Sequence, residues 1–175
     1  MEVVVDTNVI MDAVFDQLDK EDCWEILMLI RKKEITLAMS RQLKMEYFFI
    51  PSRIAIRMLE EKFNDGKLTH ALFKQVDSLV YDCMDKLSTI VDPNCRSVEV
   101  TSALKICTED PSDDKLVNLA IDANCEIIIT ENIRHLREVE NQKIKNRSGQ
   151  RIKVMTAGNF LIYHKLSGQY KVRNF

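Results

Sequence analysis

The chain has 175 residues, of which 46% are hydrophobic and 30% are charged, with only four glycines and three prolines. This length and composition are typical of one globular domain with long helices and short loops. The net charge of −2 excludes a uniformly basic surface, so a protein that binds nucleic acid would need a local basic patch.

The chain opens with three valines at residues 3–5, which predict a strand that is apolar on both faces, as in the middle of a parallel sheet. Asp6 follows at the carboxyl end of this strand, where open α/β sheets bind their ligands. We therefore expect a functional role for Asp6. The alternative is that Asp6 or Asn8 only caps the next helix.

Helices dominate the first two thirds of the chain. The apolar spacing predicts helices at residues 8–18, 21–33, 41–49, 52–63, 67–87 and 98–107, and strands at residues 34–39 and 88–91. Ser40 is the expected N-cap of the third helix, and Pro51 is expected to interrupt or bend the chain. The helix at 67–87 carries an apolar stripe, which indicates core or helix–helix packing and offers a surface for a homodimer. The stripe consists of Leu68, Leu72, Val76, Leu79, Val80, Cys83 and Leu87.

A second informative stretch is residues 110–115, where Asp, Pro and Ser form the pattern of a helix start with Asp110 or Ser112 as the N-cap. This helix is expected to reach about residue 124. The isoleucines within residues 126–130 predict another strand that is buried on both faces. A short helix at 133–139, a strand at 154–155 and a closing helix at 157–166 complete the pattern.

Strands that alternate with helices indicate an α/β fold with a parallel sheet. The polar triplets at residues 6–8 and 130–132 each follow an apolar strand, so both are expected at the carboxyl edge of the sheet. The order of elements places the start of the helix near Asp113 at the opposite edge, unless that helix is steeply tilted.

Three segments in this order and spacing resemble the PIN-domain nucleases, and most of all the toxin components of bacterial and archaeal toxin–antitoxin pairs. They are VVVDTN at residues 3–8, DPSDD at residues 110–114 continuing to residue 120, and IIITENIRHL at residues 127–136. The resemblance implies one PIN-like domain over residues 1–175, with three α/β/α layers around a mainly parallel sheet. A helical segment at about 52–107 would separate its two acidic halves, and the helix near Asp113 would tilt its start into the site.

The resemblance also implies the site residues. The positions that match the family's four acids, and would be catalytic, are Asp6, Glu46, Asp113 and Asn132. Asn132 departs from the family pattern, because an amide lacks the charge of a carboxylate. The other three would be the metal ligands. The polar residues expected to position the acids are Thr7, Asn8 and Thr130.

A cluster of carboxylates explains why a metal would be needed. Three carboxylates in one cleft repel each other, and a divalent cation removes that conflict. Carboxylate and amide oxygens suit Mg²⁺ or Mn²⁺, and a metal-bound water can attack a phosphodiester. Histidine needs no role in this chemistry, so His70, His135 and His164, which show no ligand spacing, are expected to be surface or structural residues.

The basic stretch at residues 142–153 offers a candidate for substrate binding. Lys143, Lys145 and Arg147 could contact the phosphates of a nucleic acid, which supply most non-specific affinity. The alternative is a solvated loop.

The leading hypothesis is a Mg²⁺- or Mn²⁺-dependent endoribonuclease, with RNA as substrate and, as a toxin, an antitoxin protein as partner. The alternative is a catalytically weak PIN-like RNA-binding or scaffold protein, which the amide of Asn132 favours. A third hypothesis is a phosphatase or receiver domain that is phosphorylated on the aspartate after the first strand. A phosphatase would need Asp in place of Asn8, and a receiver would need an acidic pair before Asp6 and a lysine after a late strand. The sequence has neither pattern.

The five cysteines are scattered without a C-x-x-C pair, so we expect no zinc site and a reducing, cytoplasmic environment. No apolar run approaches the roughly 20 residues of a membrane helix, so no membrane partner is expected.

Overall fold

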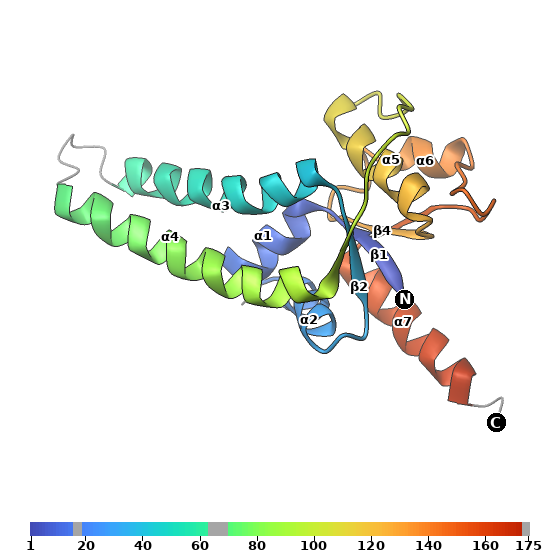
Figure 1. Ribbon diagram of the computed structural model, residues 1–175, viewed down its shortest axis with the longest axis horizontal. Coiled ribbons are helices and arrows are strands. Elements are labelled where there is room, and N and C mark those ends of the chain that lie inside the picture. The colour runs from blue at the N-terminus through green and yellow to red at the C-terminus, as the bar shows by residue number, and fades with distance from the viewer. Residues whose placement is uncertain (16–18, 63–69, 173–175) are drawn as a thin grey trace.

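The computed structural model describes residues 1–15, 19–62 and 70–172 (Figure 1). Five strands form one sheet in which every neighbouring pair is parallel, in the order β3-β2-β1-β4-β5. The strands are β1 (Glu2–Val5), β2 (Thr36–Met39), β3 (Cys95–Ser97), β4 (Ile127–Ile129) and β5 (Lys153–Met155). The predicted α/β fold with a parallel sheet is confirmed.

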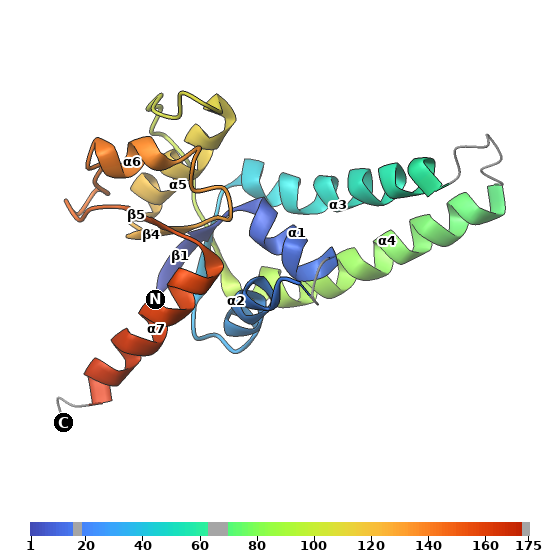
Figure 2. The same cartoon turned by 180° about the vertical axis from the view of Figure 1, so that it is seen from behind.

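Helices cover both faces of this sheet. The helices are α1 (Thr7–Phe15), α2 (Glu21–Arg31), α3 (Arg41–Lys62), α4 (His70–Val91), α5 (Asp114–Ala123), α6 (Arg137–Asn141) and α7 (Ala157–Val172), with single 3₁₀ turns η1 (Asp92–Asn94) and η2 (Pro111–Asp113). Helix α5 packs across β1, β2 and β4 on one face, and α2 packs between α1 and α7 on the other (Figure 2). Helices α3 and α4 pack against each other and extend away from the sheet (Figure 1).

Strands β1 and β4 lie side by side in the middle of the sheet. The three valines of β1 are fully buried, and so are the isoleucines of β4 to within 2% exposure. Such continuous apolar strands are expected where helices cover both faces of a parallel sheet. The side chains of these two strands therefore form the centre of the core.

The strand order reverses between β1 and β4, the position at which open α/β sheets form a crevice. The chain passes from β1 to β2 and β3 on one side, then returns through α5 to β4 and β5 on the other. Open α/β sheets bind ligands where the strand order reverses, at the carboxyl ends of the strands. Asp6 follows β1 at this position, and its backbone N–H donates to Ile129 O of β4 at 2.8 Å.

Two predictions for the middle of the chain are wrong. Residues 88–91 continue α4 and form no strand, and residues 98–107 are not helical. The second segment is held extended by side chains of α5, because Asp114 accepts the N–H groups of Ile106 and Cys107, both at 2.8 Å. The helical segment that was predicted at about 52–107 therefore ends at η1.

Two further helices differ from their predicted bounds. Residues 41–62 form the single helix α3, which passes through Pro51 without interruption, because a proline removes only one hydrogen bond and α4 packs along this helix. Residues 133–136 form turns, and α6 begins only at Arg137. The expected N-cap is confirmed, since the Ser40 hydroxyl accepts the N–H of Leu43 at 3.1 Å.

The apolar stripe on α4 is described only in part. Leu68 lies outside the described residues, as do the side chains of the stripe between it and Leu87. Leu87 is buried, at 4% exposure, and α4 packs against α2 as well as α3. The homodimer through this stripe stays a prediction. None of the helices in the described part of the chain has the length and apolar character needed to cross a membrane.

A hydrogen bond from Tyr47 connects α3 to the end of β1. The Tyr47 side chain is buried, and its hydroxyl donates to Val5 O at 2.6 Å, one residue before Asp6. Burial, together with the charges of Asp6 and Glu46, raises the pKa of Tyr47 well above its usual value, so the phenol stays a neutral donor. This bond fixes Glu46, the preceding residue on α3, relative to Asp6.

Removing the Tyr47 hydroxyl tests this attachment. We expect Tyr47→Phe to lower the free energy of unfolding by about 1 to 3 kcal/mol, because it deprives a buried carbonyl of a hydrogen bond. Urea unfolding measures the change, and Tyr81→Phe is the control, since Tyr81 is 69% exposed. Equal losses in the two variants would contradict this role.

Candidate metal centre

Asp6 is the most enclosed acid of the site. It is 8% exposed, and its Oδ2 accepts hydrogen bonds from Thr130 Oγ1 at 2.7 Å and Asn8 Nδ2 at 2.8 Å. Asn8 Nδ2 also donates to Thr130 Oγ1 at 3.1 Å, which closes a three-residue ring. The carboxylate is thus held in one orientation by the first residues after β1 and β4.

The burial of Asp6 is costly when the carboxylate is charged. Burial raises the pKa of Asp6, although the Thr130 hydrogen bond, the Lys115 charge and the backbone N–H groups of Thr7 and Asn8 act in the opposite direction. The net shift is upward. A cation beside Asp6 would therefore stabilise the ionised form.

Asp113 enters the site from the start of α5. The preceding 3₁₀ turn begins at Asp110, whose Oδ1 accepts the N–H of Ser112 at 2.9 Å as the N-cap. Asp113 is 9% exposed and makes no capping hydrogen bond. Burial and the charges of Asp6 and Asp110 raise its pKa, so Asp6 and Asp113 repel each other across the crevice. The start of α5 thus lies at the carboxyl edge, as the resemblance implies.

Glu46 reaches the site from the second turn of α3. Its Oε2 lies 2.7 Å from Lys115 Nζ and accepts a long hydrogen bond of 3.4 Å from the Thr7 hydroxyl. The side chains of Glu46 and Lys115 are 22% and 17% exposed. Lys115 also lowers the pKa values of Asp6 and Asp113, so its ammonium group is a cation shared by the whole cluster. Sequence reasoning missed Lys115, because nothing in its helix-start motif distinguishes it from a surface lysine.

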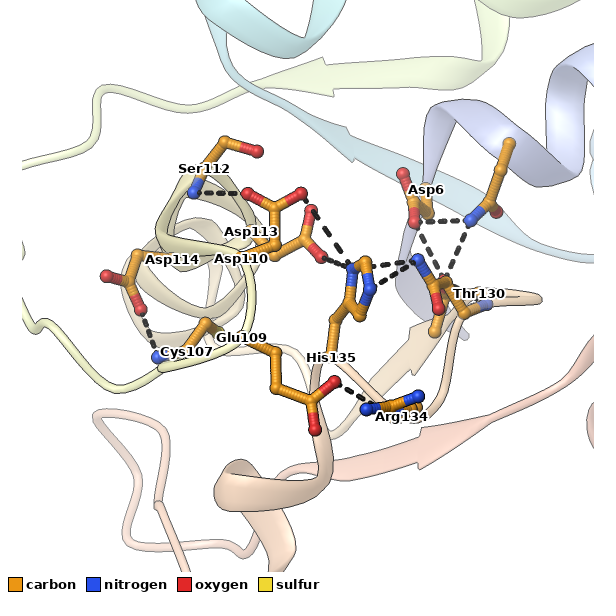
Figure 3. A network of polar contacts seen from close by, with 12 residues as sticks. Asp6, Cys107, Glu109, Asp110, Ser112, Asp113, Asp114, Thr130, Arg134 and His135 are labelled. Carbon is orange, nitrogen blue, oxygen red and sulfur yellow. Dashed lines mark hydrogen bonds and ion pairs between the residues drawn. The ribbon is translucent and has the colours of Figure 1, made fainter.

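The side chain of Asn132 contacts His135. Its Nδ2 lies 2.7 Å from His135 Nδ1, and the same ring nitrogen lies 3.2 Å from Asp113 Oδ2. The tautomer of the ring decides the direction of these contacts, because Nδ1 donates to Asp113 when it carries a hydrogen and accepts from the Asn132 amide when it does not. Figure 3 shows the ring between the Asp110 and Asp113 carboxylates and the Asp6–Thr130 pair.

The expectation that His135 plays only a surface or structural part therefore needs correction, since it contacts two candidate site residues. It lies three residues after Asn132, in the turns of residues 133–136, and that spacing is the only sequence signal that could have indicated it.

Other acids near these residues have structural partners. Asp114 accepts backbone N–H groups of the 98–107 segment, and Glu131 Oε1 accepts the N–H of Ala157 at the start of α7 at 2.9 Å. These bonds give both carboxylates backbone partners outside the acidic cluster.

The basic stretch lies at the other edge of the sheet. It leads into β5, whose first residue, Lys153, pairs with Ile127 at the amino end of β4. Arg147 Nη2 lies 2.6 Å from Asp122 Oδ1, near the end of α5 farthest from Asp113. Contact of Lys143, Lys145 and Arg147 with substrate stays a prediction, and such contact would be remote from the acids.

The donor set fits a hard divalent cation. Asp6 and Asp113 offer two carboxylates that repel each other, and the side chain of Asn132 contacts His135, which in turn contacts Asp113. Oxygen ligands of this kind suit Mg²⁺ or Mn²⁺. Asp110, Asp113 and His135 also bring one ligand atom each within 4.8 Å of one another, so the histidine lies within reach of the same centre.

The fold and the site together define an α/β protein with an acidic centre at the carboxyl edge of a parallel sheet. The family model of the PIN domain matches residues 2–134, so the chain belongs to the PIN domain family. No curated protein and no solved structure matches the chain. PIN domains are in general metal-dependent nucleases, and the acidic group described above is where this chain could hold the ion.

The charge balance of the site can be tested at Lys115. We expect Lys115→Gln to tighten Mn²⁺ binding at least about tenfold, which corresponds to about 1.4 kcal/mol, because it removes a positive charge that competes with the ion. The change also leaves Glu46 without its cation, so the metal-free variant should melt at a lower temperature than the wild type. Isothermal titration calorimetry measures the affinity.

The matched control is Lys44→Gln, which breaks the 2.9 Å ion pair of α3 with Asp92 on the exposed surface. It should leave Mn²⁺ affinity unchanged. Equal affinities in Lys115→Gln and wild type would mean that Lys115 lies too far from the ion to matter.

Proposed function

We propose that the protein is a Mg²⁺- or Mn²⁺-dependent endoribonuclease. The observation that carries the proposal is the pair of buried acids, Asp6 and Asp113, whose pKa values are raised by burial and whose charges oppose each other. Buried carboxylates with raised pKa values and a charged neighbour cluster at functional sites. Membership of a family of metal-dependent nucleases supports the same conclusion.

The chain's own residues have distinct parts in this proposal. Asp6 and Asp113 would hold the ion, with Asn132 contributing its amide oxygen and Glu46 acting through Lys115. When bound, the divalent ion supplies Lewis-acid chemistry and an activated water for phosphodiester hydrolysis. Thr130 and Asn8 keep Asp6 in one orientation. The ammonium group of Lys115 faces the negative charge that a phosphate brings into the crevice.

RNA as the substrate class rests on the resemblance to PIN-domain toxins in residues 3–8, 110–120 and 127–136. The same resemblance supports a role as the toxin of a toxin–antitoxin pair in the cytoplasm, with an antitoxin protein as partner. A neighbouring reading frame that encodes a small DNA-binding protein would support this role. The alternative, a PIN-like RNA-binding or scaffold protein with little activity, is favoured by one feature only, the amide at Asn132.

An assay of metal-dependent cleavage distinguishes the nuclease from the RNA-binding or scaffold protein. We expect the protein to cut single-stranded RNA with Mg²⁺ or Mn²⁺ and to lose all cutting in EDTA, whereas a scaffold gains nothing from metal. A single-stranded DNA of the same sequence tests the choice of RNA. Cutting that persists in EDTA would contradict the metal mechanism.

Asp113→Asn is the matched variant. It should abolish cutting and keep the fold, with an equal or higher melting temperature in EDTA at neutral pH. The raised pKa of Asp113 means that its contribution to stability is full below the usual value of 3.8 and is lost as the pH rises through the raised pKa. The neutral amide therefore removes a destabilising charge. A lower melting temperature would show that the Asp113 carboxylate stabilises the metal-free fold.

A further inference from the structure

A groove of about 650 Å³ runs along the exposed side of α3. Its lining includes Arg41, Met45, Phe49 and Arg53, at intervals of four residues that place them on one side of the helix, together with Glu46. Glu46 belongs to the acidic centre, so one wall of the groove is shared with the candidate active site. The proposed chemistry at that centre makes no use of the other four residues.

In the described part of the chain, no ion pair involves either arginine of this groove. Both side chains are exposed. Among the described residues that line the groove, Glu46 is the only acid, and its carboxylate is paired with Lys115 at 2.7 Å. The groove is therefore positively charged in a protein whose net charge is −2.

Between the arginines lies an exposed apolar surface. Phe49 is 58% exposed and Met45 is 47% exposed, one turn apart on α3. An aromatic ring in this position is not needed for the core. Proteins that bind single-stranded nucleic acid combine cations along the backbone path with aromatic rings on which bases stack, and each stacked base contributes about 1 to 3 kcal/mol.

The groove continues into a second one, of about 500 Å³, that lies against the start of α5. Arg41 and Gln42 line both grooves, and the second also contains Ser112 and Lys115, next to Asp113. Arg41 and Arg53 are twelve residues apart, a distance of about 18 Å along a helix, which leaves room for several nucleotides. A strand lying along α3 would thus lead directly to the acids.

We propose that the groove along α3 binds single-stranded RNA, with a base stacked on Phe49 and backbone phosphates at Arg41 and Arg53. The proposal rests on the proposed function, since it gives the path by which the substrate reaches the metal centre. It also assigns substrate binding to this groove in preference to the basic stretch at residues 142–153, which lies at the opposite edge of the sheet. A protein partner on the same apolar surface is the alternative occupant.

The experiment measures binding without cleavage. A fluorescein-labelled single-stranded RNA oligonucleotide is titrated with the protein in EDTA, and fluorescence anisotropy is recorded at several salt concentrations. We expect Phe49→Ala to weaken binding about fivefold or more and Phe49→Trp to restore it. Tyr81→Ala removes an aromatic ring that is 69% exposed on α4, and it should leave the affinity unchanged.

The charge contribution is tested with two double variants that change the net charge equally. Arg41→Gln with Arg53→Gln should weaken binding and reduce the slope of log affinity against log salt by about 1.4, since each phosphate contact on a single strand contributes about 0.7. Lys143→Gln with Lys145→Gln should change both quantities less. Because the four arginine and lysine side chains are exposed, circular dichroism should show every variant folded.

Three results would overturn the groove proposal. They are an absence of RNA binding by the wild type, wild-type affinity in Phe49→Ala, and equal effects of the two charge variants. Sedimentation gives a further test, because a dimer that Phe49→Ala converts to a monomer would make this surface an interface between copies.

The binding and cleavage assays distinguish failure of the groove proposal from failure of the proposed function. If the wild type binds RNA as described and never cuts it with Mn²⁺, the nuclease function is wrong and the RNA-binding groove is retained. If it cuts RNA and all variants bind equally, only the groove fails.

Discussion

The structure depends on a carboxylate buried between two central strands. Asp6 follows a fully buried strand, and the hydroxyl of Thr130, which follows the neighbouring strand β4, donates to it at 2.7 Å. Both positions arise from the reversal of strand order between β1 and β4. A buried carboxylate is costly without charge compensation, and Asp6 receives part of it from the Thr130 hydroxyl, the Asn8 amide and the charge of Lys115.

The other polar groups of the site come from three separate elements, and together they leave the site short of positive charge. Helix α5 brings Asp113 and Lys115 from its first turn, α3 brings Glu46, and the turn after β4 brings Asn132 and His135. Lys115 compensates for Glu46 directly, whereas Asp6 and Asp113 keep raised pKa values. The amide at position 132 reduces the deficit by one charge. A single divalent ion held by the two aspartates would balance the rest.

The sequence predicted the centre of this fold better than its periphery. Strands β1 and β4 are continuous runs of β-branched residues, so their burial and their polar ends could be inferred directly. The 98–107 segment has helical spacing but is held extended by Asp114, a long-range contact that local periodicity does not contain. His135 and Lys115 were missed for the same reason, because they acquire their partners only when α3, α5 and the turn after β4 meet.

The central proposal is that Asp6 and Asp113 hold one metal ion together. Crystals of the protein soaked in Mn²⁺, with the ion located by anomalous scattering, test this most directly. We expect one strong peak between the carboxylates of Asp6 and Asp113, and its loss in crystals of Asp113→Asn. A peak that involves Asp110 or His135 without Asp6, or no peak at all at saturating Mn²⁺, would contradict the account.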